Sequence, residues 1–243
     1  MKPAYKRVLL KLSGEALMQG FDEKGTKKDG IIDFDFLDIV CKKIKEAVNS
    51  GVQVAIVVGG GNIWRGAKNP NFDRVRADYM GMLATTINSI GIQDALIQNG
   101  VKAKVMTAVD VERAADSFDR FKAVELLEQG TVVIFGFGLG TPFFSTDTTA
   151  VVRAAEIGAD MVLFAKNVDG VYDKDPVLYP DAVKIEKLTY TEILSKDLKV
   201  IDSTAAAFAK SNNIPIFIFG LNNPNNILSA LGGENIGSLI TAE

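Results

Sequence analysis

Residues 136–147 read GFGLGTPFFSTD and join an apolar run, residues 131–135, to a helical pattern that begins at Thr146. The apolar run predicts a buried strand, because a parallel strand covered on both faces is apolar throughout. Glycines, a proline and hydroxyl side chains then precede the helix. Ligands of open α/β sheets bind beyond the carboxyl ends of strands, so this stretch predicts a pocket for a small, polar molecule.

The same alternation of apolar runs and helical patterns extends along the chain in both directions. The predicted strands are residues 7–12, 52–58, 103–107, 131–135, 160–165, 184–188, 215–219 and 238–241. The predicted helices run from an Asp33 cap to Ser50, from an Asp78 cap to about Gln98, and over residues 118–128, 146–157, 189–194, 203–211 and 224–231. This alternation predicts an α/β fold, a three-layer sandwich around a mostly parallel central sheet.

No repeat or linker divides the chain, so a single domain over residues 1–243 is expected. Residues 18–30 are polar and rich in glycine, lysine and aspartate, which predicts a flexible surface loop. Four predicted strands end in glycine or polar residues, and function is expected where these four ends meet. The ends are residues 11–14, 59–62, 136–147 and 166–175.

Composition excludes several classes of protein. A net charge of −3 gives no electrostatic footprint for nucleic acid. The single cysteine, Cys41, rules out an internal disulfide framework and suits a reducing cytosol. Apolar runs are too short to span a bilayer, and Lys11 interrupts the first of them, so a signal peptide is not expected. A cytoplasmic protein is therefore predicted.

The chain contains no histidine, which excludes serine–histidine triads and histidine-ligated metals. Catalysis would then depend on lysine, arginine, aspartate, hydroxyl groups and backbone amides. Phosphoryl transfer suits this set, because it relies mainly on positioning and electrostatic stabilisation.

The run Gly59-Gly60-Gly61-Asn62 follows a predicted strand and removes side chains where amides can approach an anion. A tight turn that needs glycine for its dihedral angles is the alternative. The run contains neither a G-x-G-x-x-G fingerprint nor a Walker A sequence. Three glycines exceed what one turn needs, which favours phosphate binding.

Charged residues near these ends are candidates for the same chemistry. Lys11, near the end of an apolar strand, must reach water, a carboxylate or a ligand, and we favour a transferring phosphate. Arg65 either forks two phosphate oxygens or is a solvated loop residue. Asp147, Asp175 and Asp202 would orient the lysine or hold magnesium, although helix capping accounts equally well for Asp147 and a turn before Pro176 for Asp175.

Together these residues resemble the amino acid kinase family and, within it, the bacterial UMP kinases. The resemblance covers residues 6–241. Its most specific segments are KRVLLKLSGEAL, VVGGGNIWRGA, DYMGMLAT, TPFFSTD, VDGVYDKDP and LTYTEIL.

The resemblance implies transfer of the ATP γ-phosphate to UMP, with Mg²⁺, in pyrimidine nucleotide biosynthesis. The N-terminal part of such a domain binds mainly UMP and the C-terminal part mainly ATP. The implied catalytic residues are Lys11, Arg65, Asp147 and Asp202. The implied ATP-binding residues are Lys11, Leu12, Ser13, Gly14, Gly61, Arg65, Lys166, Tyr172 and Asp175. The implied UMP-binding residues are Gly60, Asp78, Leu139, Gly140, Thr141, Pro142, Phe143, Phe144, Ser145 and Thr146.

The family resemblance further implies a homohexamer that GTP activates and UTP inhibits. Leu139 stands where the family carries threonine, so only its backbone can contact the nucleotide. Lys166 and Asn167 stand where relatives often carry threonine or asparagine. The family's counterpart of the 18–30 loop is linked to GTP activation, and here it is longer and more charged.

Two other functions remain open at this point. The first is a kinase of the same family with a different small acceptor, such as a carboxylate or carbamate. Asp78 argues against an acidic acceptor, because a carboxylate suits ribose hydroxyls. The second is a nucleotide sensor without turnover, and the presence of Lys11, Arg65 and the three aspartates argues against it.

Overall fold

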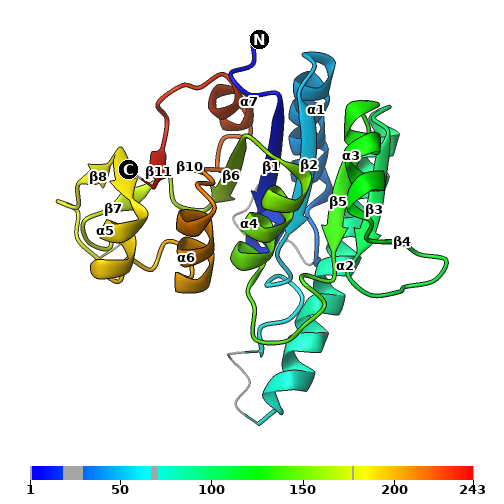
Figure 1. Cartoon of the computed structure of the whole chain (residues 1–243), viewed down its shortest axis with the longest axis horizontal. Coiled ribbons are helices and arrows are strands. Elements are labelled where there is room, and N and C mark those ends of the chain that lie inside the picture. Colours follow the sequence, from blue (N-terminus) through cyan, green and yellow to red (C-terminus); the bar gives the residue numbers. More distant parts are fainter. Residues whose placement is uncertain (1, 19–29, 67–70, 177, 243) are drawn as a thin grey trace.

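The computed structural model describes residues 2–18, 30–66, 71–176 and 178–242. Most of the loop predicted over residues 18–30 therefore lies outside the described residues. Within them, helices cover both faces of a central sheet (Figure 1). The predicted α/β sandwich around a mostly parallel sheet is confirmed.

The central sheet has nine strands in the order β4-β3-β5-β2-β1-β6-β10-β11-β9. All neighbouring strands run parallel except β10 and β11. Its strands are β1 (Arg7–Leu12), β2 (Gln53–Val58), β3 (Ala103–Thr107), β4 (Asp116–Ser117), β5 (Val132–Gly136), β6 (Met161–Lys166), β9 (Lys187–Thr189), β10 (Ile216–Gly220) and β11 (Ser238–Thr241).

A small second sheet pairs β7 (Val171–Tyr172) with β8 (Lys184–Ile185). The strand predicted over residues 184–188 is therefore wrong as one element, because its two halves, β8 and β9, belong to different sheets. The two-residue strands β4 and β7 were not predicted, because two residues are too few to show the alternation of apolar and polar side chains that indicates a strand.

The helices agree with most of the predicted ranges. They are η1 (Gly14–Met18), α1 (Phe34–Asn49), α2 (Arg74–Gln98), α3 (Arg120–Glu128), α4 (Thr146–Ile157), α5 (Tyr190–Ser195), α6 (Ser203–Ser211) and α7 (Asn226–Leu231). Asp33 caps α1, and Thr189 with Glu192 forms the predicted capping box of α5. The predicted Asp78 cap is wrong: Asp73 caps α2, and Asp78 lies inside the first turns of the helix, where its carboxylate binds Arg74 and the Phe143 N–H.

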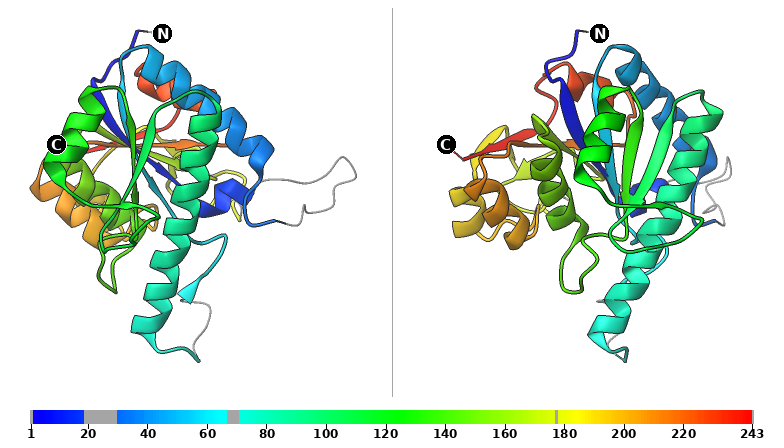
Figure 2. Two further views of the ribbon diagram at one scale, coloured as in Figure 1. Left: turned by 90° about the vertical axis from the view of Figure 1, so that its right-hand side faces the viewer. Right: turned by 45° about the vertical axis from the view of Figure 1, so that its right-hand side comes forward.

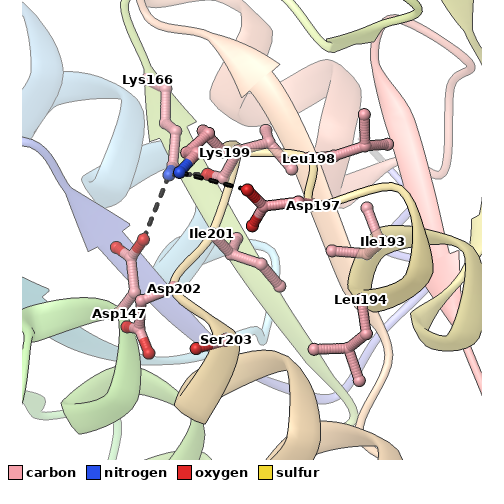
Figure 3. Close-up of a pocket in the computed structure, with 11 residues that line it drawn as sticks. Asp147, Lys166, Ile193, Leu194, Asp197, Leu198, Lys199, Ile201, Asp202 and Ser203 are labelled. Atoms are coloured by element: carbon pink, nitrogen blue, oxygen red, sulfur yellow. Dashed lines mark hydrogen bonds and ion pairs between the residues drawn. The ribbon is translucent and has the colours of Figure 1, made fainter.

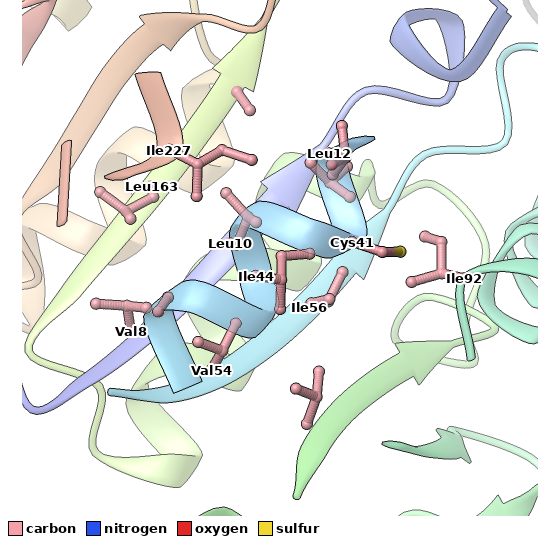
Figure 4. Packing of buried hydrophobic residues seen from close by; sticks show 14 of the residues in the cluster. Val8, Leu10, Leu12, Cys41, Ile44, Val54, Ile56, Ile92, Leu163 and Ile227 are labelled. Carbon is pink, nitrogen blue, oxygen red and sulfur yellow. The ribbon is translucent and has the colours of Figure 1, made fainter. Parts of the chain in front are cut away.

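Alternate side chains of β1 supply the two cores. Val8, Leu10 and Leu12 pack with α1, α7 and the C-terminal half of α2, as Figure 4 shows. Leu9 packs on the opposite face, in a cluster with residues of α3, α4, α5 and α6. The period of two along the strand thus divides the helices into two layers, and the N-terminal part of α2 projects beyond the sheet (Figure 2).

The neighbouring strands β5, β2, β1 and β6 carry the four polar strand ends predicted from the sequence. Parallel strands end on the same edge of a sheet, so these ends lie side by side. The chain moves outward from β1 to β2 in one direction and later from β6 to β10 in the other. The gap between β1 and β6 is thus a switch in strand order, where open α/β sheets bind ligands.

Candidate active site

A lysine–aspartate–lysine cluster spans this switch point. Lys11 of β1 is 7% exposed, and its Nζ lies 2.7 Å from Oδ1 of Asp147 on α4. Lys166 ends β6, and its Nζ lies 3.2 Å from the other carboxylate oxygen, Oδ2 (Figure 3). Lys166 also donates a hydrogen bond to the Val200 carbonyl. Two lysines from adjacent strands therefore share one buried carboxylate.

The charged groups of the cluster shift one another's pKa values. Burial by itself would raise the pKa of Asp147, but Lys11 and Lys166 outweigh it and lower the pKa to about 2. Burial lowers the pKa of Lys166, against the attraction of Asp147. Asp202 also acts on Lys166, so two carboxylates face the two ammonium groups. What this edge of the sheet offers a phosphate is therefore two ammonium groups held at fixed positions.

The start of α4 is held by hydroxyl groups. Ser145, not Asp147, caps this helix, because its Oγ accepts from the backbone N–H of Asp147 and Thr148. Ser145 and Thr148 also donate to the carboxylate of Asp202. Asp202 in turn caps α6 by accepting from the Ala205 N–H at 2.8 Å. The starts of α4 and α6 are therefore joined, and Asp147 is free to face the lysines.

The glycine run after β2 lies against the segment after β1. A Cβ on Gly14 would lie 2.4 Å from the Gly59 carbonyl oxygen, so the two segments approach too closely for side chains. A Cβ on Gly60 would lie 2.8 Å from the Gly81 carbonyl oxygen in α2. Gly59, Gly60 and Gly61 all avoid the left-handed region. Close approach, and not unusual dihedral angles, therefore explains Gly14 and Gly60, and a Cβ on Gly59 would lie only 3.0 Å from the Gly14 nitrogen.

Arg65 lies over this glycine run. Its guanidinium forms an ion pair with Glu15 of η1, and its Nε would be 3.3 Å from a Cβ on Gly61. Leu12, by contrast, has its side chain in the core, and its carbonyl accepts from the Gly59 N–H at 3.0 Å. Ser13 donates its N–H to the Ala165 carbonyl of β6 at 3.4 Å.

The stretch from Phe137 to Ser145 lies along the N-terminal half of α2. Its first residue donates its N–H to Oγ1 of Thr85 at 3.0 Å. Near its end, the N–H of Phe143 donates to Oδ2 of Asp78 at 2.8 Å. Leu139, Gly140 and Pro142 are half-buried, whereas Thr141, Phe143, Phe144 and Ser145 are exposed, and Thr146 is half-buried at the start of α4. The residues from Leu139 to Thr146, which the resemblance assigns to UMP binding, therefore form one wall beside α2.

Two adjoining cavities open on the other side of the lysine cluster. The first, of about 340 Å³, has Asp147, Lys166 and Asp202 among its lining residues (Figure 3). The second, of about 440 Å³, is lined in part by Tyr172 and Asp175. Both are bounded by the loop from Asp197 to Val200. Together they are large enough for a nucleotide-sized ligand that reaches the cluster.

The profile of the amino acid kinase family matches residues 6–220. The chain belongs to the amino acid kinase family. Solved structures of UMP kinases are similar to this chain over almost its whole length. A UMP kinase from Bacillus anthracis is 37% identical with a TM-score of 0.91, and covers 98% of this chain and 97% of its own.

Two further solved structures agree with this family membership. A UMP kinase from Ureaplasma parvum is 36% identical with a TM-score of 0.89, covering 97% of this chain and 98% of its own. A uridylate kinase from Archaeoglobus fulgidus is 29% identical with a TM-score of 0.72, covering 96% and 99%.

Several residues at the site of this amino acid kinase were not found by reasoning from single motifs. The contact between Lys166 and Asp147 was also not predicted, although both residues were named. The sequence does suggest it, because Lys166 ends an apolar strand much as Lys11 does. Glu15 and Arg74, the partners of Arg65 and Asp78, carried no signal, since single charges near helix starts are common.

Among the described residues of this amino acid kinase, no group of three or more histidine, cysteine, aspartate or glutamate side chains is placed to hold a metal. In the same described part of the chain, no helix is both long and apolar enough to cross a membrane.

Proposed function

We propose that this chain is an ATP-dependent UMP kinase, which transfers the γ-phosphate of ATP to UMP and forms UDP for pyrimidine nucleotide synthesis. The observation that carries the proposal is the Lys11–Asp147–Lys166 cluster at the switch point, with cavities on one side and the Asp78 wall on the other. The similarity to two bacterial UMP kinases over nearly the whole chain supports the choice of acceptor.

On the donor side, ATP would occupy the two cavities, with Tyr172 and Asp175 near its adenosine part. Its phosphates would extend along Lys166 toward Lys11, Leu12, Ser13 and Gly14. Leu12 would contribute only its backbone, because its side chain lies in the core. Gly61 and Arg65, which follow the neighbouring strand β2, would contact the phosphates from the other side. This assigns ATP mainly to the C-terminal part of a single domain.

On the acceptor side, UMP would lie between Gly60 and the wall formed by Leu139, Gly140, Thr141, Pro142, Phe143, Phe144, Ser145 and Thr146. Asp78 would accept hydrogen bonds from the ribose hydroxyls. A carboxylate oxygen accepts more than one hydrogen bond, so its contact with the Phe143 N–H leaves capacity for a ribose.

The reaction needs no general base, because a UMP phosphate oxygen is already anionic. The chain must bring two polyanions together, and their repulsion at contact distance is substantial. Lys11 and Arg65 would offset that charge, while Asp147 and Asp202 would fix Lys11 and the start of α4. Mg²⁺ bound with ATP would neutralise further phosphate charge.

The exposed face of α2 supports the proposal that the chain forms a homo-oligomer, with a hexamer as the expected state. Leu83, Ile87, Ile90 and Ile97 are 51%, 52%, 39% and 53% exposed, and three of them are spaced by seven residues. This face, the α2 stripe, has the repeat of a helix-pairing seam. Antiparallel packing about Ile90 would place Leu83 of one copy opposite Ile97 of the other, as a two-fold interface requires.

We further propose a cytoplasmic enzyme that GTP activates and UTP inhibits. The two effector assignments rest on the family resemblance, and the location rests on the resemblance and on the composition. They would be tested separately, by fractionation and by rate measurements with each nucleotide present.

An ADP-release assay with ATP, Mg²⁺ and one acceptor at a time tests the function. We expect turnover with UMP and little with CMP, carbamate or acetylglutamate. Turnover only with an acidic acceptor would identify another kinase of the family. Nucleotide binding without ADP release from any acceptor would identify a sensor.

A further inference from the structure

The carboxylate of Asp78 has a second partner that the proposed reaction does not use. Arg74 lies one turn earlier on α2, and its Nε lies 3.0 Å from both Oδ1 and Oδ2 of Asp78. The side chain of Asp78 is 21% exposed and that of Arg74 is 59% exposed. The guanidinium of Arg74 thus holds the Asp78 carboxylate from the more exposed side of the pair.

The same arginine also contacts the acceptor-side wall. Its guanidinium carbon lies 5.5 Å from the centroid of the Phe143 ring, within the range of a cation–π contact. Phe143 has a φ of 73°, which is unfavourable for a bulky residue and is held here by its N–H bond to Asp78. Arg74, Asp78 and Phe143 therefore form a closed set of three contacts, here called the α2 clasp.

We propose that Arg74 is a positioning residue that sets ribose specificity: it orients Asp78 toward the ribose hydroxyls and fixes the wall at Phe143. The inference rests on the proposed function, because it takes Asp78 as the ribose contact. An exposed ion pair alone contributes little to stability. The role of this pair is to hold the Asp78 carboxylate, which accepts hydrogen bonds, at a fixed place relative to the wall.

Arg74 leaves the carboxylate able to bind a ligand. Its bond is shared between two oxygens, and the Phe143 N–H uses one position on Oδ2. An ionised carboxylate has about four acceptor positions, so Oδ1 keeps capacity for a hydroxyl. A ribose hydroxyl and Arg74 can therefore bind Asp78 together, and Arg74 does not compete with the substrate.

The test compares Arg74→Gln and Arg74→Lys with Arg76→Gln, an exposed arginine on the same helix turn. Initial rates with UMP and with dUMP give kcat and KM for each acceptor, and the KM for ATP is measured in parallel. We expect Arg74→Gln to raise the KM for UMP by roughly tenfold, the size of one charge-assisted hydrogen bond. The preference for UMP over dUMP should fall, with the KM for ATP unchanged.

Arg74→Lys keeps the charge but loses the planar group over Phe143, so it should recover part of the preference. Asp78→Asn combined with Arg74→Gln should lose less than the sum of the two single changes, because Arg74 acts in part through that carboxylate and in part through its contact with Phe143. An unchanged UMP-to-dUMP ratio in Arg74→Gln would overturn the inference, even if the variant were less stable. Absence of UMP turnover by the unaltered protein would instead overturn the proposed function.

Discussion

At the scale of single residues, Lys11 is expected to act on the transition state. Lys11→Ala removes an ammonium held 2.7 Å from Asp147, at the edge of the sheet where the two proposed substrates would meet. We expect kcat to fall about a hundredfold or more, as for other charge-stabilising groups, with little change in the KM for UMP. Steady-state kinetics with Lys6→Ala, an exposed lysine just before the same strand, provide the control. A change confined to KM would show that Lys11 only binds.

Asp147 gives a prediction about stability and pH. Its folded pKa, about 2, is below the ordinary value of 3.8. Folding therefore favours the ionised carboxylate, which contributes about 2 kcal/mol to the free energy of unfolding. This contribution is present above pH ~4 and is lost as the pH falls toward ~2. Urea unfolding at a series of acidic pH values should show the loss.

Asp147→Asn provides the comparison for that series. Because Lys11 and Lys166 lose their shared partner, we expect the variant to be about 3–5 kcal/mol less stable at neutral pH. Its stability should also depend less on pH between about pH 4 and pH 2. An equally steep pH dependence in both proteins would assign the acid sensitivity to other carboxylates.

At the scale of elements, contact between the glycine run and α2 decides the geometry of the acceptor side. A Cβ on Gly60 would lie 2.8 Å from the Gly81 carbonyl oxygen and 2.9 Å from the Ala84 Cβ, so α2 would have to move. We expect Gly60→Ala to cost about 1–3 kcal/mol, as overpacking does. Thermal unfolding measures the cost.

Gly61→Ala is the matched control for this change. A Cβ there meets Nε of Arg65 at 3.3 Å, and a flexible side chain can shift more easily than a helix backbone. The melting temperature of Gly61→Ala should therefore stay close to that of the unaltered protein. Similar losses in both variants would mean that the contact with α2 is not what requires glycine.

At the scale of the whole molecule, the α2 stripe predicts self-association. Leu83 and Ile87 are each about half exposed, so a double change to lysine should not disturb the core. We expect Leu83→Lys with Ile87→Lys to reduce the mass measured by light scattering after size exclusion. Phe121→Lys, at a residue 76% exposed on α3, should leave the mass unchanged. If the double variant keeps the full mass, the subunits associate through another surface.

Local sequence patterns determined most elements and the edge of the sheet that carries the site. β1, β3, α4, α6 and β11 begin and end where their patterns predict, because apolar period and caps act over only a few residues. The four polar strand ends were also identified from the sequence, since each directly follows an apolar run. Alternation with helices then made the strands parallel, which gathers those ends on one edge.

Tertiary structure alone decided which distant residues touch and which faces are covered. Lys11 and Lys166 share Asp147 because β1 and β6 are neighbours, and that order depends on crossovers no local pattern encodes. Among the residues of α2, the apolar Leu83 and Ile87 are exposed while the polar Asn88 and Ser89 are buried. A period shows that a helix has two faces, whereas only packing against the rest of the chain determines which face is turned inward.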